Sequence, residues 1–184
     1  MDFQNNFKTV IIDLDDYSFK RCDDPINIII TRSKTDDLVI DSEFLSHVKF
    51  CDMKIDNVKN VIGICDYFME GAECVNDNKI CLNFPDVKNI GKHFCDNLIF
   101  NNKITFKFPE IESVGKYFMR NLNRQQYTPN SIMSVKIPES TEMEFGFCER
   151  ARLNKFIIPF KVEAKYNFHD HDIKQIVIKQ ILIK

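Results

Sequence analysis

The string His169-Asp170-His171-Asp172 contains the residue types that most resemble a metal-binding site. Alternate residues of a strand face the same side, so His169 and His171 could offer two imidazoles to one zinc ion. A third ligand at a fixed spacing is missing, and a polar turn explains the same residues. We therefore expect no metal site. A metal-dependent enzyme using His169 and His171 is the least favoured of three functional hypotheses.

Other groups of reactive residue types are equally incomplete. His93 lies close to Cys95, but near neighbours in an extended or helical segment point apart, so a packed histidine is favoured over a cysteine–histidine dyad. The N-terminal aspartates lack the glycine and final glutamate of an EF-hand loop, which favours a solvated acidic cap. These aspartates are Asp13, Asp15, Asp16, Asp23 and Asp24. No serine-hydrolase, P-loop, zinc-protease or dinucleotide motif occurs in the sequence, so we expect neither an enzyme nor a cofactor.

Composition restricts the partners. The chain has 184 residues, 44% hydrophobic and 28% charged, with a formal charge of −2 and a pI near 6.1. This balance gives no general attraction to nucleic acid or an anionic membrane, so a charged partner must be recognised by a local patch. No apolar stretch is long enough to span a membrane, and no ordinary secretion signal is visible. Seven cysteines without a CxxC pair predict reduced, buried thiols. We expect a cytoplasmic protein, with surface exposure or secretion by a non-standard route as the alternative.

A phenylalanine that recurs at nearly constant intervals predicts how the chain is organised. The series is Phe19, Phe44, Phe68, Phe94, Phe118, Phe147 and Phe168, in steps of 25, 24, 26, 24, 29 and 21 residues. A proline precedes each of the last four by nine residues: Pro85, Pro109, Pro138 and Pro159. Such regularity indicates a stack of similar units, each presenting one bulky plug to its neighbour.

Within a unit, the pattern apolar-polar-apolar-proline predicts a short strand that the proline ends. Gly91 and Gly115 then predict a tight or positive-φ corner. The aromatic plug begins a short helical or irregular return segment. Cys95, Met119 and Cys148 follow the plug as core fillers.

The two ends of the chain differ from the middle. Residues 1–50 show the pattern faintly and are interpreted as degenerate N-terminal repeats that form a cap. Residues 51–184 are predicted to form one continuous repeat domain. The last residues, Ile176 to Lys184, are typical of a strand without a polar cap, and such an edge favours pairing with another chain.

These units resemble leucine-rich repeats of the BspA-like, treponema-type class, whose unit reads roughly Leu-x-x-Ile-x-Ile-Pro-x-x-Val-x-x-Ile-Gly-x-x-Ala-Phe-x-x-Cys. The match is carried by Val135-Lys136-Ile137-Pro138, by Ile90-Gly91 with Phe94, and by Val114-Gly115 with Phe118. It covers residues 51–168 and, more weakly, 10–50. Phenylalanine replaces the usual aliphatic residue at Phe84, Phe106 and Phe108.

The resemblance implies a right-handed α/β-type solenoid. Short parallel strands would form its concave face, and irregular or short helical segments its convex face. The position between the two inward apolar residues of each strand would then line the concave face. The residues at this position are Lys54, Asn83, Lys107, Lys136 and Ile157, followed by Val177.

Two functions follow from this row. The leading hypothesis is a non-enzymatic interaction module whose lysines bind an acidic surface on a protein partner, or another polyanion. We expect no nucleic-acid partner. The alternative is a structural unit that self-associates through its uncapped C-terminal strand. A third interpretation leaves the row without a ligand, as a solvated face that water screens.

Overall fold

The computed structural model describes residues 7–16, 24–55, 58–125, 128–138, 140–158, 173 and 176–178. All regular elements within these residues are β-strands. They are β1 (Thr9–Asp13), β2 (Ile26–Thr31), β3 (Leu38–Ile40), β4 (Lys49–Ile55), β5 (Val61–Ile64), β6 (Glu73–Cys74), β7 (Ile80–Asn83), β8 (Asn89–Ile90), β9 (Ile99–Phe100), β10 (Lys103–Lys107), β11 (Ser113–Val114), β12 (Ile132–Lys136), β13 (Glu142–Met143), β14 (Lys155–Ile158) and β15 (Ile176–Ile178).

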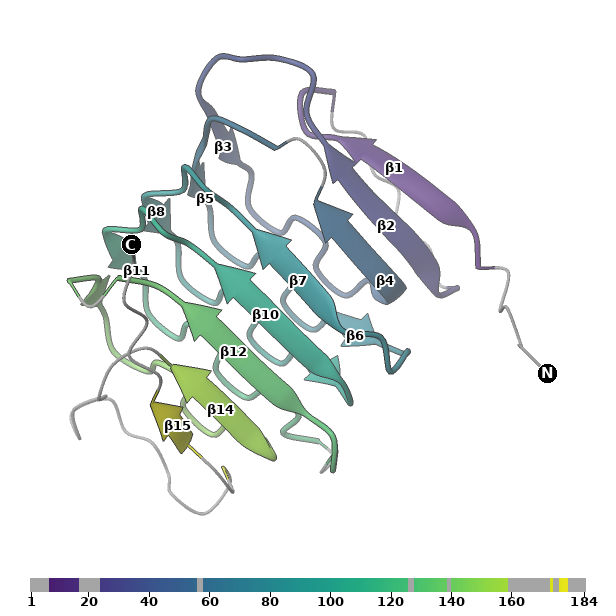
Figure 1. The fold of residues 1–184 in the computed structure, drawn as a ribbon, viewed down its shortest axis with the longest axis vertical. Coiled ribbons are helices and arrows are strands. Elements are labelled where there is room, and N and C mark those ends of the chain that lie inside the picture. Colours follow the sequence, from purple (N-terminus) through teal and green to yellow (C-terminus); the bar gives the residue numbers. More distant parts are fainter. Residues whose placement is uncertain are drawn as a thin grey trace.

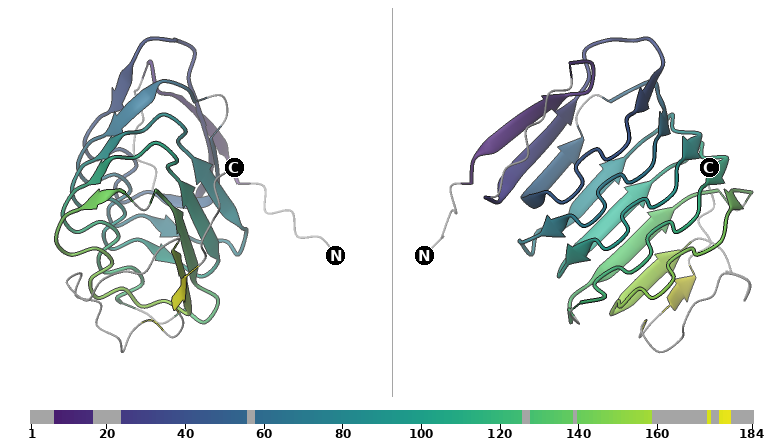
Figure 2. Two further views of the ribbon diagram at one scale, coloured as in Figure 1. Left: turned by 60° about the vertical axis from the view of Figure 1, so that its left-hand side comes forward. Right: turned by 180° about the vertical axis from the view of Figure 1, so that it is seen from behind.

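The strands form three five-stranded sheets in which every pair is parallel (Figures 1 and 2). Sheet A has the order β1-β2-β4-β6-β9, sheet B the order β13-β11-β8-β5-β3, and sheet C the order β15-β14-β12-β10-β7. None of the three closes into a barrel within the described ranges. The predicted parallel strands are confirmed, and β1 to β3 belong to the same sheets as the strands that follow them.

Stacked phenylalanine rings fill the space between the sheets. Phe44, Phe68, Phe94, Phe118 and Phe147 are each at most 1% exposed. Their centroids are 5.7, 4.9, 5.1 and 5.4 Å apart from one ring to the next, and consecutive ring planes differ by 10° or less. The predicted interleaved plug is confirmed for these five rings, while Phe19 and Phe168 lie outside the described residues.

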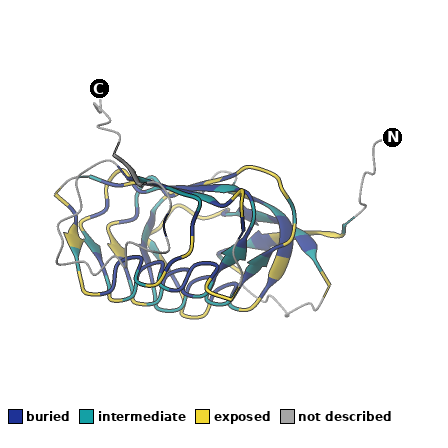
Figure 3. Ribbon diagram, turned by 90° about the horizontal axis from the view of Figure 1, so that it is seen from below, coloured by how far each residue is buried: buried dark blue, intermediate teal, exposed yellow. Residues whose placement is uncertain are grey.

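Return segments between the sheets are turns, and the described residues contain no helix. In one segment, His93, Cys95 and Asn97 have φ values of 60°, 55° and 57°, so left-handed residues alternate with others and a right-handed helix cannot form. The backbone N–H of His93 donates to Lys116 O (2.9 Å), and that of Cys95 to Phe68 O (2.7 Å). The irregular alternative of our prediction is therefore observed, because these peptide groups bond to adjacent segments and not within a helical turn. Figure 3 shows the exposed bends along the outside of the molecule.

The corner glycines act by close packing. Neither Gly91 nor Gly115 has a positive φ, so that part of the prediction is wrong. A Cβ atom on Gly115 would lie 2.8 Å from the carbonyl carbon of Gly91 and from the nitrogen of Lys92. Adjacent corners approach so closely that a side chain at this position has no room.

A buried ion pair between Arg32 and Asp15 links the loops at the N-terminal end. The Arg32 Nε donates to Asp15 Oδ1 (3.1 Å), and its guanidinium also donates to the backbone oxygens of Lys59 and Asp36. The other oxygen of Asp15 accepts the backbone N–H of Ser33 (2.9 Å) and of Lys34 (2.6 Å). The side chain of Asp15 is 5% exposed, so this aspartate departs from the solvated cap that the sequence predicts.

Truncation of the central plug tests its energetic role. Phe94 contacts the rings of Phe68, Phe106, Phe108 and Phe118, so Phe94→Ala leaves a cavity among them. We expect a loss of about 3–5 kcal/mol in the free energy of unfolding, measured by urea denaturation. Phe145→Ala is the control, because that ring is 48% exposed and its loss should cost about 1 kcal/mol or less. Equal losses in the two variants would contradict the buried stack.

The hydrogen bonds of Asp15 predict that the N-terminal end of the structure loses stability at acidic pH. Burial raises the pKa of Asp15, but hydrogen bonds from Lys34, Arg32 and Ser33 outweigh burial and lower the pKa below its ordinary value of 3.8. Folding thus favours the carboxylate, whose stabilisation is full above that value and is lost as pH falls through the folded pKa. We expect Asp15→Asn to be less stable than wild type at pH 7, with the difference shrinking toward about pH 2. The control is Asp16→Asn, and a difference independent of pH contradicts the assignment.

Candidate binding surface

Alternation along sheet C decides which side chains reach its outer side. Ile104 and Phe106 of β10, and Met133 and Val135 of β12, belong to the buried core. Residues between and beside them therefore face outward, because successive side chains of a strand point to opposite faces.

Three of the predicted residues are neighbours on this outer side. The register of sheet C pairs Asn83 with Lys107, and Lys107 with Lys136. Asn83 and Lys136 are exposed, and Lys107 is half-buried.

Register bonds do not link the other two to this row. The ladder predicted from the sequence is wrong at Ile157, which stays on the outer side of sheet C but is displaced by two residues. Lys54 lies on β4, which is beside β7 (Figure 1), so its place in the ladder stays a prediction. Lys54 is exposed but belongs to β4 of sheet A, where its register partner is Ile29. Ile157 pairs with Ser134, two residues from Lys136. The displacement of Ile157 arises because two spacings differ. The register partners Ile132 and Lys155 are 23 residues apart in the sequence, whereas Pro138 and Pro159 are 21 residues apart. Aligning units by their prolines therefore misplaced the strand. Val177 does lie opposite Ile157.

Sequence reasoning missed two lysines on the same side. Lys103 is the first residue of β10, and Lys155 is the first residue of β14. Both are register partners of Ile132, which lies between them on β12. Extending the alternation of β10 by two steps from Lys107, through Thr105, would have found Lys103. Between the lysines, Thr105 and Ser134 pair across β10 and β12 and are both buried.

Charge is segregated on this surface, which we call the basic face and define by Lys103, Lys107, Lys136 and Lys155. The outward positions of β7, β10, β12 and β14 are Cys81, Asn83, Lys103, Thr105, Lys107, Ile132, Ser134, Lys136, Lys155 and Ile157. They hold four lysines and no acidic residue in a chain whose net charge is −2. None of the four lysines pairs with an acidic group of the described residues.

Adjacent strands are about 4.8 Å apart, so lysines on consecutive strands sum their potential over a narrow area. Their ammonium groups donate hydrogen bonds to carboxylate, sulfate or phosphate oxygens. The surface is therefore suited to binding an anion-rich partner.

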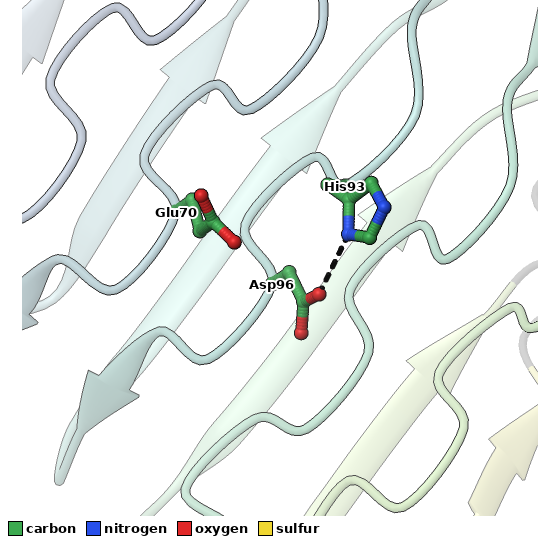
Figure 4. Close-up of side chains that lie close together, drawn as sticks. All are labelled: Glu70, His93 and Asp96. Carbon is green, nitrogen blue, oxygen red and sulfur yellow. Dashed lines mark hydrogen bonds and ion pairs between the residues drawn. The ribbon is translucent and has the colours of Figure 1, made fainter.

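A second polar group surrounds Asp96, which is 0% exposed (Figure 4). Its Oδ2 lies 2.8 Å from His93 Nδ1 and accepts hydrogen bonds from Arg120 NH2 (2.6 Å) and Nε (3.0 Å). The amide of Asn121 donates to Oδ1 (3.0 Å). Glu70, His93 and Asp96 each offer one ligand atom within 4.8 Å of the others, which is a spacing that a metal ion could use.

Arg120 already supplies the positive charge in this cluster. Burial lowers the pKa of Arg120, but its hydrogen bond and charge contact with Asp96 outweigh burial and raise the pKa above its ordinary value. Its guanidinium also lies 4.2 Å from the ring centre of Tyr117, and His93 stacks on Tyr67 at 4.9 Å. A metal on Asp96 would have to displace these contacts, so we interpret the cluster as structural. The packed His93 that the sequence predicts is observed, whereas the bonds of Asp96 and Arg120 were missed.

The buried thiols are core residues. Burial raises the pKa of Cys95 and of Cys148 well above the ordinary value, and raises that of Cys74 to about 11. A thiol held in the neutral form is a poor nucleophile. The six described cysteines are free, and four of them are buried as the sequence predicts. Cys65 is half-buried and Cys81 is exposed, so the predicted burial is wrong for these two, and Cys22 lies outside the described residues.

Several expectations are not covered by the structure. His169 and His171 lie outside the described residues, as does the chain from Lys179 onward. Self-association through the C-terminal strand therefore stays a prediction. The described part of the chain has no helix able to cross a membrane.

Comparisons with protein-family models, with curated proteins and with solved structures gave no match to this chain.

The Asp96 cluster makes a prediction that separates the two interpretations. Asp96→Asn leaves Arg120 without its buried carboxylate, so the free energy of unfolding should fall by about 3 kcal/mol in urea denaturation. Zinc or EDTA should leave the melting temperature of the wild-type protein unchanged. A rise of the melting temperature with zinc, absent from Asp96→Asn, would contradict the structural interpretation, because a bound metal stabilises the folded state.

Proposed function

We propose that the chain is a right-handed leucine-rich-repeat solenoid of the treponema type that acts as a non-enzymatic protein-interaction module. Its basic face binds an acidic surface of a macromolecular partner, most simply a protein. We place the module in the cytoplasm, where its free thiols would remain reduced. The observation that carries the proposal is the register pair Lys107–Lys136, flanked by Lys103 and Lys155, on outward positions without an acidic residue.

The electrostatic argument compares this face with the rest of the molecule. Lys49 pairs with Glu73 at 3.2 Å, and Lys92 with Asp66 at 3.5 Å, each across adjacent segments. Such pairing between segments is thus available to lysines of this chain. Four like charges on neighbouring strands, without an acidic partner among the described residues, repel each other, and an acidic partner would relieve that repulsion.

The proposal can be tested with a simple acidic probe. Poly-L-glutamate imitates an acidic protein surface, and fluorescence anisotropy of a labelled sample measures its binding. We expect wild-type affinity to fall steeply as salt rises, because added ions screen exposed charges. The variant Lys107→Glu, Lys136→Glu, Lys155→Glu should bind at least about tenfold more weakly.

A matched control distinguishes the contribution of the basic face to affinity from that of the net charge of the protein. The variant Lys59→Glu, Lys88→Glu, Lys116→Glu changes the net charge by the same amount at exposed lysines that lie outside β7, β10, β12 and β14. It should lose much less affinity than the first variant. Equal losses in both would assign binding to net charge, and no binding by wild type at low salt would remove the acidic partner altogether.

A further inference from the structure

The strand β1 is the terminal strand of sheet A. Among the described residues β1 pairs only with β2, and Figure 1 shows it at the end of its sheet. The N–H of Asn27 donates to Lys8 O, and the N–H of Leu14 donates to Thr31 O. Even-numbered residues of β1 therefore direct their peptide groups toward β2, because alternate residues of a parallel strand bond to opposite sides. The N–H and C=O groups of Thr9 and Ile11 point away from β2.

The exposed edge also carries an apolar side chain. Ile11 is 67% exposed, the largest exposed fraction among the exposed large apolar residues of the described chain. Strands that end a sheet commonly carry lysine, proline or a bulge that prevents further pairing. The span Thr9–Asp13 contains none of these, and its pairing with β2 is regular.

We propose that β1 pairs with β1 of a second copy of this chain, antiparallel, about a two-fold axis at Ile11. Opposite residues then have numbers that sum to 22, so Ile11 faces Ile11 and Thr9 faces Asp13. In such a pair Ile11 exchanges two N–H···O bonds with its counterpart, and each Thr9 exchanges two with the opposite Asp13. The carbonyl of Asp13 already accepts the N–H of Asp16 (3.2 Å), so its second lone pair would accept the N–H of Thr9. The interface thereby satisfies the free main-chain groups of both copies with one register, and extends beyond the proposed function of the basic face.

The charges of β1 fit this arrangement. The two-fold axis places each Asp13 opposite a threonine hydroxyl, and keeps the two Asp13 carboxylates four residues apart along the strand. Asp15 is already held by Arg32 in its own copy, so it adds no free charge at the junction. The two Ile11 side chains meet at the centre, where each covers apolar surface that is exposed in the single chain.

The experiment uses the full chain. Sedimentation equilibrium from about 1 to about 500 µM should show a monomer–dimer equilibrium, because one strand pair is a small interface and its affinity is expected to be modest. Hydrogen exchange should show the amides of Thr9 and Ile11 becoming protected as concentration rises. Ile11→Lys should raise the dissociation constant at least about tenfold.

Two further variants make the result specific. Ile11→Pro removes only an N–H that points away from β2, so it should also abolish the dimer while the chain stays folded by circular dichroism. Val39→Lys, on a residue that is 45% exposed on the edge strand β3, is the matched control and should leave dimerisation unchanged. A monomer throughout the concentration range, assemblies that keep growing beyond two copies, or a dimer indifferent to Ile11→Lys would each overturn the proposal.

Discussion

The face-to-face contact between consecutive phenylalanine rings sets the spacing of the whole structure. Ring centroids along the central stack are 4.9 to 5.7 Å apart, close to the roughly 4.8 Å between hydrogen-bonded strands. The packing of the rings and the hydrogen bonds between strands therefore favour a similar distance between successive segments. Phenylalanine serves this position well, because it has no polar group that would need a partner in a dry interior.

A consequence of this common spacing is that residues at the same place in successive segments become neighbours. Opposite charges then pair across segments, as Asp96 and Arg120 do at 2.6 Å within the turns. Like residues also become neighbours: the rings of Tyr67, His93 and Tyr117 contact one another in sequence, and Lys107 lies beside Lys136 on sheet C. A residue type that is repeated at one position of successive segments therefore covers a continuous area of the surface. The outward positions of β7, β10, β12 and β14 carry no acidic residue over such an area, which supports the proposed binding role.

The sequence predicted the features that one segment specifies by itself. The strand before Pro109 and the buried ring of Phe118 follow from local alternation and from apolar size, and both were predicted. Features that depend on two segments were missed. The role of Gly115 depends on the backbone of Gly91, and the opposition of Ile157 to Ser134 depends on the length of an intervening loop. The sequence left open whether the return segments are helical or irregular for the same reason, since the backbone N–H groups of His93 and Cys95 donate to other segments.

A stack of parallel strands satisfies its interior peptide groups on both sides but leaves each terminal strand half-bonded. At the N-terminal end, Arg32 and Asp15 bond to backbone groups of the loops that follow β2 and β4, while the outer side of β1 stays without a partner among the described residues. Ile12 and Leu14 on the inner side of this end are buried. The unsatisfied part of this end is therefore a line of backbone groups with Ile11 at its centre, and an extended strand of matching polarity is the structure that can complete it.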